Sequence, residues 1–372
     1  MSSKSTIVKS KTNILHFVTG IGLGGAEKVV WDLCRFSDRE NFQVMVLAIV
    51  KTSIKIGDFN KENIQLKELN LDKSIFGFIK GCEEVSQFVR DNKIDIIHAH
   101  MFHPLLVALL IKLFKPSIKI VFTPHNFNIG SKIREFITGV TKEWRAADIL
   151  FSKNMYKGIY RKNAFVIPNG ISVKDFELEL PKFKKNTFLC IGRLEKAKNQ
   201  IALIKPVKEL KTLGYQFQLF LVGDGQNRDL LEDAIRENQL EDYIFLLGNR
   251  RDIPALCKQA HCLLIPSLWE GLPIVLLEAG ASSLPVISTN VGSIASVIDE
   301  GNGYLIADTT GLKDKMKEVM DCYEIAQEKG DALYQRIKNQ YDIETIVKKH
   351  EVLYNKLLPT FSSKSQEVIT VV

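Results

Sequence analysis

Two glutamates eight positions apart, Glu270 and Glu278, are the side chains of this 372-residue chain best placed to do chemistry. They bracket the turn E-G-L-P, which follows a short apolar run and leads into an almost wholly apolar helix. The start of a helix offers free N–H groups and the positive end of a dipole, which favour phosphate, and Gly271 lets the backbone approach a ligand. Carboxylates accept hydrogen bonds from hydroxyl groups. The stretch therefore predicts a phosphate site flanked by two glutamates that bind the hydroxyls of a sugar and a ribose.

The alternative is that both glutamates are solvated surface residues, as most isolated glutamates are. Glu278 fits this alternative poorly, because its helix neighbours Ile274 to Leu277 are apolar and an unpartnered carboxylate among them would be costly. We therefore favour the anion site.

A basic motif follows the first strand of the same half of the chain. Arg193 and Lys198 lie in the stretch I-G-R-L-E-K-A-K-N, after an apolar run at 188–191. A planar guanidinium and a mobile ammonium together suit a diphosphate, although two solvated basic residues at a strand end are the alternative. Gly223, in the turn V-G-D-G, could let a nucleotide approach, although such glycines more often serve the turn alone.

The loop G-I-G-L-G-G at residues 20–25 fits the pattern G-x-G-x-x-G between a strand and a helix, which raises a dinucleotide cofactor as an alternative. That cofactor needs an acidic residue at the end of the second strand, where this chain has Val50 and Lys51. A Walker loop does not fit either, because Ala-Glu follows Gly25 where Lys and Ser or Thr are needed. What remains is a glycine loop whose amides approach a phosphate or sugar, or a plain tight turn.

Four histidines lie at or after predicted strand ends: His98, His100, His103 and His125. A zinc site would require them to converge with an open position, and the chain has no H-E-x-x-H motif. It also has no D-x-D pair of the kind that bridges a diphosphate through a metal. We therefore expect no metal and no required cofactor, with His125 in the ligand site and His98 in a structural role.

The composition is that of a globular protein, with 45% hydrophobic and 25% charged residues and a formal net charge of +7. No basic run carries interleaved aromatic residues, so nucleic acid is disfavoured, while the mild charge fits an anionic membrane surface or phosphorylated ligands. The longest apolar stretch, Leu105 to Phe114, is too short to span a bilayer, and the N-terminus lacks the apolar core of a signal peptide. Six scattered cysteines without a C-x-x-C pair favour a cytosolic compartment.

Strands alternate with helices along the chain, which predicts an α/β fold of parallel, doubly wound sheets. Strands are expected at 13–19, 43–50, 94–99, 118–122 and 148–152, and in a second series at 188–191, 218–222, 244–247, 262–265 and 285–288. Helices are expected after residue 25 and around 78–89, 105–114, 133–144, 198–213, 226–238, 252–259, 273–282 and 343–358. We expect two Rossmann-like domains that face each other across a cleft at the carboxyl ends of their strands.

The domain boundaries follow from this alternation. We expect a disordered lead at residues 1–12, a first Rossmann-like domain at 13–178 and a second at 179–342, with the charged stretch 176–186 as the linker. A helix at 343–358 and a flexible tail at 359–372 complete the chain.

The predicted helix at 132–144 allows two interpretations. Its apolar face, with basic residues around it, suits either a membrane surface or a sheet. We favour a helix that covers the sheet and has a solvated basic side, which includes Arg145.

Together the motifs resemble the retaining, two-domain (GT-B) nucleotide-sugar glycosyltransferases of family 4, which include lipopolysaccharide, capsule and O-antigen transferases. The resemblance covers nearly the whole chain and rests on these stretches: Gly24 to Glu27, Asp95 to His100, Ile167 to Ile171, Gly192 to Leu194 with Lys198-Asn199, Gly223 to Gly225, the two glutamates, and Tyr341 to Tyr354. The last is similar to the family's final helix, which crosses back onto the first domain. One departure is Val291-Gly292-Ser293, where relatives often carry two glycines.

The resemblance implies a role for each matching residue. Arg193 and Lys198 would bind the donor diphosphate, Glu278 the ribose, and Glu270 the donor sugar, with His125 beside the transferred sugar. Backbone in the glycine motifs would complete the donor site, at Gly24, Gly25, Gly223, Gly271 and Leu272. The domain at 13–178 would lie on the acceptor side, and the domain at 179–342 would bind the nucleotide sugar.

The expected activity is transfer of a hexose or N-acetylhexosamine, with retention, from a nucleotide-diphosphate sugar, UDP-sugar favoured, to a lipid-linked or saccharide acceptor. The setting would be surface polysaccharide or lipopolysaccharide biosynthesis on the cytoplasmic face of a membrane, with peripheral contact to anionic lipid. A nucleotide-sugar epimerase or NAD enzyme, and a non-catalytic glycosyltransferase-like subunit, are the alternatives.

Overall fold

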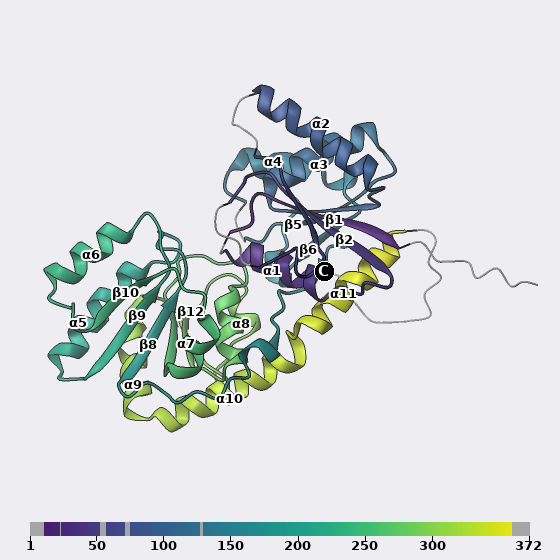
Figure 1. The fold of residues 1–372 in the computed structure, drawn as a ribbon. Helices are drawn as coiled ribbons and strands as arrows, with labels where there is room; N and C mark the ends of the chain where they lie inside the picture. The colour runs from purple at the N-terminus through teal and green to yellow at the C-terminus, as the bar shows by residue number, and fades with distance from the viewer. Residues whose placement is uncertain (1–10, 23, 53–56, 71–74, 127–128, 359–372) are drawn as a thin grey trace, which may run out of the picture. The chain divides into compact units, whose positions relative to one another are not determined.

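Figure 1 shows a computed structural model of the chain, which describes residues 11–22, 24–52, 57–70, 75–126 and 129–358. The chain divides into two compact units: Met1–Ile167 with Val347–Val372 form the first, and Pro168–Ile346 form the second. The predicted lead up to residue 10 and the predicted tail at 359–372 lie outside the described residues. Each unit is built on one parallel sheet with helices between its strands, so the predicted α/β class is confirmed.

The first unit contains a seven-stranded sheet in the order β3-β2-β1-β4-β5-β6-β7. Its strands are β1 (Thr12–Val18), β2 (Phe42–Ala48), β3 (Gln65–Glu68), β4 (Ile96–His100), β5 (Lys119–Thr123), β6 (Ala147–Leu150) and β7 (Phe165–Val166). Its helices are α1 (Gly25–Arg35), α2 (Ile75–Asp91), α3 (Phe102–Phe114) and α4 (Lys132–Val140), and α11 (Ile343–Leu357) joins it from Val347 onward. Figure 1 shows α2 and α3 on one face of this sheet and α1 on the other.

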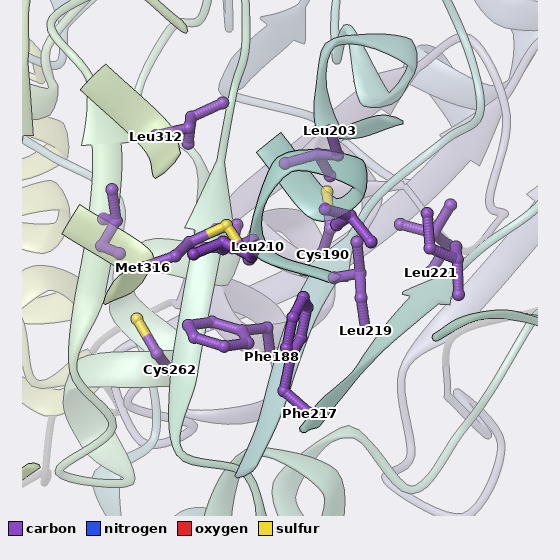
Figure 2. Packing of buried hydrophobic residues seen from close by; sticks show 14 of the residues in the cluster. Phe188, Cys190, Leu203, Leu210, Phe217, Leu219, Leu221, Cys262, Leu312 and Met316 are labelled. Atoms are coloured by element: carbon purple, nitrogen blue, oxygen red, sulfur yellow. The ribbon is translucent and has the colours of Figure 1, made fainter. Parts of the chain in front are cut away.

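The second unit contains a six-stranded sheet in the order β10-β9-β8-β11-β12-β13. Its strands are β8 (Asn186–Ile191), β9 (Phe217–Val222), β10 (Ile244–Gly248), β11 (Cys262–Ile265), β12 (Val286–Thr289) and β13 (Tyr304–Ile306). Its helices are α5 (Ile204–Thr212), α6 (Arg228–Glu237), α7 (Ile253–Gln259), α8 (Ile274–Ala281), α9 (Leu312–Asp321) and α10 (Tyr323–Gln340). Figure 2 shows the core between this sheet and its helices, where Phe188 and Leu219 of the strands pack with Leu210 and Met316 of α5 and α9.

In both sheets the order in which the chain adds strands reverses at an interior pair of strands, although all the strands stay parallel. In the first unit the chain builds outward from β1 to β3 and then returns to place β4 on the other side of β1. In the second unit it builds from β8 to β10 and then places β11 on the other side of β8. Loops at such a reversal diverge from one another, and ligands of open α/β sheets bind there.

Several short or polar elements were not predicted from the sequence. Strand β3 reads Q-L-K-E and lies at the sheet edge, and β7 and β13 have two and three residues, which is too few for a periodic signal. Helices α9 and α10 are rich in charge and carry a thin apolar stripe that includes Met316, Leu333 and Ile337.

Two predictions about surface segments differ from the structure. The stretch 176–186, predicted as a linker, lies within the second unit, where Phe183 N donates to Gln259 O at 2.8 Å. The prediction that α4 covers the sheet with its apolar face is wrong, because Ile133, Phe136 and Val140 are exposed. Arg145, predicted on a solvated basic side, is instead buried and bonds both carboxylate oxygens of Asp148 at 2.6 and 2.9 Å.

Candidate active site

In the second unit, an ion pair bridges the two loops at the strand reversal. Lys198 lies after β8 and Glu270 after β11, and Lys198 Nζ is 2.7 Å from Glu270 Oε1. Ser267 Oγ donates to the same oxygen at 2.7 Å. The side chain of Lys198 is 24% exposed and that of Glu270 is 8% exposed. The attraction between charges this shielded from water is stronger than in a surface ion pair. When a ligand binds, Lys198 can exchange Glu270 for an anion, and Glu270 can accept a hydrogen bond from a hydroxyl group.

The loop that carries Glu270 is held by hydrogen bonds to residues of several other segments. Asn199 Nδ2 donates to Pro266 O at 3.1 Å, and Leu268 N donates to Ala197 O at 2.8 Å. Farther along, Thr289 Oγ1 donates to the carbonyl of Ser267, and the buried Asn169 side chain donates to the carbonyl of Leu272 at 2.8 Å. The loop is therefore preorganised, since its backbone groups are held in place by partners on other loops.

Gly292 makes a close backbone approach at the departure Val291-Gly292-Ser293. Its φ is +61°, a conformation that favours glycine, and a Cβ there would collide with the carbonyl oxygen of Glu270. Ser293 N donates to Gly271 O at 2.8 Å. One glycine thus provides the close approach, and the buried Ser293 locks the turn through its backbone N–H.

Arg193 and Gly223 lie on neighbouring strand ends of the same sheet. The Arg193 side chain is mostly exposed, with its Nη1 3.5 Å from Glu195 Oε2, so the guanidinium can turn to a ligand at little cost. Gly223 has φ +132°, and a Cβ there would collide with the Gly192 carbonyl oxygen. Close packing of the two turns is thus a sufficient reason for glycine at this position.

Glu278 lies in α8, whose other residues are apolar or small, and is 7% exposed. Burial and, after it, the negative charge of Glu278 raise the pKa of the Cys257 thiol on α7. A buried carboxylate in an apolar helix departs from the usual distribution of glutamate, as the sequence indicated.

In the first unit, Gly24 and Gly25 begin α1. Gly24 is the N-cap, and a side chain there would collide with the carboxylate of Glu27. The carboxylate lies at the helix start, where a negative charge is stabilised. An anion that bound at this helix start would therefore compete with the Glu27 carboxylate for the same place.

His125 lies just after β5 at the end of a row of three buried histidines. His125 Nε2 is 2.8 Å from His100 Nδ1, and His100 Nε2 is 3.0 Å from His16 Nδ1. Strands β1 and β4 are neighbours, and β4 places His98 and His100 on the same face, because side chains two residues apart in a strand point the same way. We call His16, His100 and His125 the histidine row.

His98 belongs to a second network that packs against the histidine row. Its Nε2 is 2.8 Å from Thr123 Oγ1 and its Nδ1 is 2.8 Å from the Tyr354 hydroxyl of α11, while its ring centroid is 4.0 Å from that of His100. These contacts support the structural role expected for His98.

Burial keeps the histidine row neutral. It lowers the pKa of His16 and of His125 to about 3, with a smaller contribution from His350. Burial and then the neighbouring histidines also lower the pKa of His98 and His100 well below the ordinary value. At neutral pH each ring therefore has one N–H and one lone pair.

A metal must also be considered, because ring nitrogens of His16, His98 and His100 lie within 4.8 Å of one another. The hydrogen bonds described above occupy both nitrogens of His98 and both of His100. A metal would have to displace such bonds, so the observed contacts fit the donor set of a metal site poorly.

Of the residues predicted to form the site, the structure thus brings together Lys198, Glu270, Gly271 and Leu272 in one pair of loops. His16, Thr123 and Tyr354 were not predicted. Two signals point to the histidines: His16 interrupts the apolar strand I-L-H-F-V, and H-A-H alternates in β4.

Comparison with known proteins gives consecutive family matches along the chain. The model "Glycosyltransferase Family 4" matches residues 23–175, and the model "Glycosyl transferases group 1" matches residues 174–339.

Several curated relatives and solved structures are similar over most of their length. UDP-Gal:alpha-D-GlcNAc-diphosphoundecaprenol alpha-1,3-galactosyltransferase of Escherichia coli is 27% identical over 328 residues, 80% of this chain and 84% of that protein. N-acetyl-alpha-D-glucosaminyl L-malate synthase of Bacillus anthracis is 24% identical over 331 residues, 80% of this chain and 85% of that protein. Anabaena Alr3699/HepE in complex with UDP-glucose aligns with a TM-score of 0.81 at 19% identity, over 92% of this chain and 99% of that one.

Proposed function

This chain belongs to the family 4, group 1 glycosyltransferases, enzymes of the GT-B fold that use nucleotide-sugar donors, and we propose that it transfers a hexose or N-acetylhexosamine from a UDP-sugar to a lipid-linked or saccharide acceptor. The observation that carries the proposal is the Lys198–Glu270 pair on its preorganised loops at the strand reversal. The E. coli relative is named for UDP-Gal and a diphosphoundecaprenol-linked acceptor, and the Anabaena structure holds UDP-glucose. Both names support a UDP-sugar donor, and the first supports a lipid-linked acceptor.

The proposed donor site uses the charged groups in complementary ways. Lys198 and Arg193 bind the diphosphate, which requires Lys198 to exchange Glu270 for a phosphate oxygen. Glu270, released from Lys198 but still bonded to Ser267, accepts hydrogen bonds from hydroxyls of the donor sugar. Glu278 accepts from the ribose hydroxyls.

The proposed reaction retains the configuration of the anomeric carbon. An acceptor hydroxyl oxygen forms a bond to that carbon while the bond to the diphosphate oxygen breaks, and the hydroxyl proton passes to an oxygen of the leaving diphosphate. The protein contributes positioning and stabilisation of the negative charge on the leaving group, through Lys198 and Arg193. His125, in the first unit, contacts the transferred sugar.

Thermal unfolding with a ligand panel tests the donor. A ligand that binds the native state raises the melting temperature, so one UDP-sugar and free UDP should stabilise the protein, whereas NAD should not. Arg193→Ala and Glu278→Ala should abolish both this shift and sugar transfer, and the exposed Arg251→Ala is the matched control for charge. Full activity in both site variants would refute the site assignment, and stabilisation by NAD alone would refute the donor class.

The exposed face of α4 supports a second part of the proposal, contact with a membrane. Ile133 is 72% exposed, Phe136 69% and Val140 61%, and Trp144 just beyond the helix is also exposed. Their spacing of three or four residues places them on one side of the helix. Lys132 is exposed beside them, and no helix among the described residues is long and apolar enough to cross a bilayer.

We propose that this α4 face inserts into the surface of an anionic membrane that carries the acceptor. An apolar face beside the exposed Lys132, on a chain with a net charge of +7, complements such a surface. Co-sedimentation with vesicles containing anionic lipid should capture the wild type, and an Ile133→Ser/Phe136→Ser variant should remain in the supernatant. Leu230→Ser, at an exposed apolar residue of the second unit, is the control. Equal capture of all three proteins would contradict the proposal.

A further inference from the structure

The histidine row has a property that no single histidine has, because its three rings share protons. Each neutral imidazole carries one N–H and one lone pair. The two N···N contacts, at 3.0 and 2.8 Å, each need one N–H and one lone pair. Two of the three N–H groups are therefore used inside the row, and the third must point outward from one of its ends.

Only two arrangements satisfy both contacts. In the first, His16 donates to His100 and His100 donates to His125, so the third N–H is on Nδ1 of His125. In the second, every bond is reversed, and the third N–H is on Nε2 of His16. A change of tautomer at any one ring breaks a hydrogen bond unless the other two change as well, so the rings are coupled.

The two ends differ in their surroundings. His16 is 2% exposed, and the hydrogen bond that the structure gives for its ring is the one from Nδ1 to His100. His125 is 8% exposed and lies after the end of β5, in the more open position. An N–H at the less exposed end finds a partner in water or ligand less readily than one at the more open end, so the third N–H is favoured at His125.

We infer that the histidine row holds His125 in the Nδ1–H tautomer, so that His125 is a hydrogen-bond donor to an oxygen of its sugar ligand, and that His16 and His100 are positioning residues. This inference rests on the proposed function in one respect: that His125 contacts the sugar. It gives His125 a defined chemistry, because a ring that donates through Nδ1 and accepts from His100 through Nε2 has no lone pair left to serve as a general base.

The backbone of His125 supports this role. His125 has φ +59°, a left-handed conformation that costs a non-glycine residue energy and is kept only where its surroundings enforce it. The hydrogen bond from His100 and the edge-on packing of Phe151, with ring centroids 5.5 Å apart, fix the ring on this strained backbone. The ring is thus held in one orientation as well as one tautomer.

Side-chain NMR on protein labelled with ¹⁵N only in histidine tests the tautomer directly. The sequence has seven histidines, and the two ring nitrogens of each give different ¹⁵N shifts according to which one carries the proton. The wild type should show His125 with a protonated Nδ1 and an unprotonated Nε2. His100→Phe should give His125 a mixture of tautomers, and His16→Phe, which leaves His100 against His125, should have a smaller effect.

His98→Phe is the matched control, because His98 lies on the same strand, is equally buried and belongs to the other network. It should lower the melting temperature and leave the tautomer of His125 unchanged. If His100→Phe does not fold, the His16→Phe spectrum decides. A protonated Nε2 on His125 in the wild type, or an unchanged tautomer in the row variants, would overturn the inference, as would stoichiometric metal in the purified protein by elemental analysis.

Kinetics connects the tautomer to the reaction. His100→Phe should lower kcat roughly 10- to 100-fold, the range found when a metal-bound histidine loses the outer partner that orients it, with KM for the donor nearly unchanged. His98→Phe should retain kcat. If His125→Ala is fully active while the NMR result stands, the proposed sugar contact fails but the histidine row does not. If the NMR result fails, the inference fails whatever the activity.

Discussion

The strand order reverses at the same place in the two units, but the side chains at the reversal are neutral in the first unit and charged in the second. Between β1 and β4 of the first unit lies a buried set of neutral histidines that bond one another. Between β8 and β11 of the second unit lies the Lys198–Glu270 ion pair, whose lysine is partly exposed. The same strand order therefore supports two different sites. One is neutral, with hydrogen bonds that run in one direction, and the other is charged, with an ion pair that can open to bind a ligand.

The difference follows from what each group requires on burial. A buried charge needs an opposite charge or several hydrogen bonds, and Glu270 has both, in Lys198 and Ser267. A buried histidine can instead lose its proton, as the lowered pKa of His16 and of His125 indicates. The first site should thus depend on pH through its stability, and the second through its ligand contacts.

Acid should have the largest effect, and mainly on the first unit. The pKa of His16 and of His125 is about 3 in the folded protein and about 6.5 when unfolded, so the unfolded chain binds more protons between these values. Stability is complete above about pH 6.5 and falls as the pH decreases toward 3, by up to about 1.4 kcal/mol per pH unit for each of these histidines. Among the described residues, the titratable groups near the row include His98 on β4, whose ring packs on His16 and His100, and His350 on α11, whose charge, after burial, lowers the pKa of His16 and His125. Tyr354 on α11 contacts His98.

Hydrogen exchange with peptide resolution, at pH 7 and pH 5, measures this effect in each unit. Peptides of β1, β4 and β5 should lose protection at pH 5 more than peptides of β8 and β11, since His261 is the only histidine of the second unit. His16→Phe should weaken the pH dependence. Equal loss of protection in both units would contradict the contrast between them.

Removing the cation of the second site should have the next largest effect. Lys198→Met leaves the Glu270 carboxylate without its cation and removes a phosphate contact, so kcat/KM should fall about 10²- to 10³-fold. Lys196→Met, at an exposed lysine two residues away, is the control and should retain activity. In Lys198→Met/Glu270→Gln the melting temperature should recover while activity stays low, because the unpaired charge is gone and the contact is still missing. Recovery of activity in the double variant would show that Lys198 serves only to neutralise Glu270.

Gly292→Ala should have the smallest effect of the three. Its added methyl group would push on the Glu270 carbonyl, so the thermal shift with the donor should shrink and donor KM should rise. Gly248→Ala is matched in backbone strain, with φ +64°, but its Cβ would meet no atom within 4 Å. Gly248→Ala should lose about 1 kcal/mol of stability from its backbone conformation alone, and Gly292→Ala should lose more because of the contact with the Glu270 carbonyl. Only Gly292→Ala should weaken donor binding. Equal donor affinity in both would mean that the loop position is not critical.

Much of the fold was predictable because its signals are local. Alternation of apolar runs with amphipathic stretches placed ten strands and indicated parallel, doubly wound sheets. The edge strand β3 and the helices α9 and α10 were missed, because a polar sequence can form such elements when only a thin side of each is buried. The exposed apolar face of α4 was misinterpreted, since periodicity shows that a helix has an apolar side and not what that side contacts.

The sequence by itself determined the family, the glycine turns and the candidate donor-binding residues, because each of these depends on residue type and short spacing. Only the tertiary structure joined Lys198 to Glu270 across 72 positions and His16 to His100 across 84. Such pairs depend on strand order, which brings β8 beside β11 and β1 beside β4, and no local pattern specifies that order. The neutrality of the histidines is likewise a property of burial, which the packed sheet imposes and the residue type leaves open.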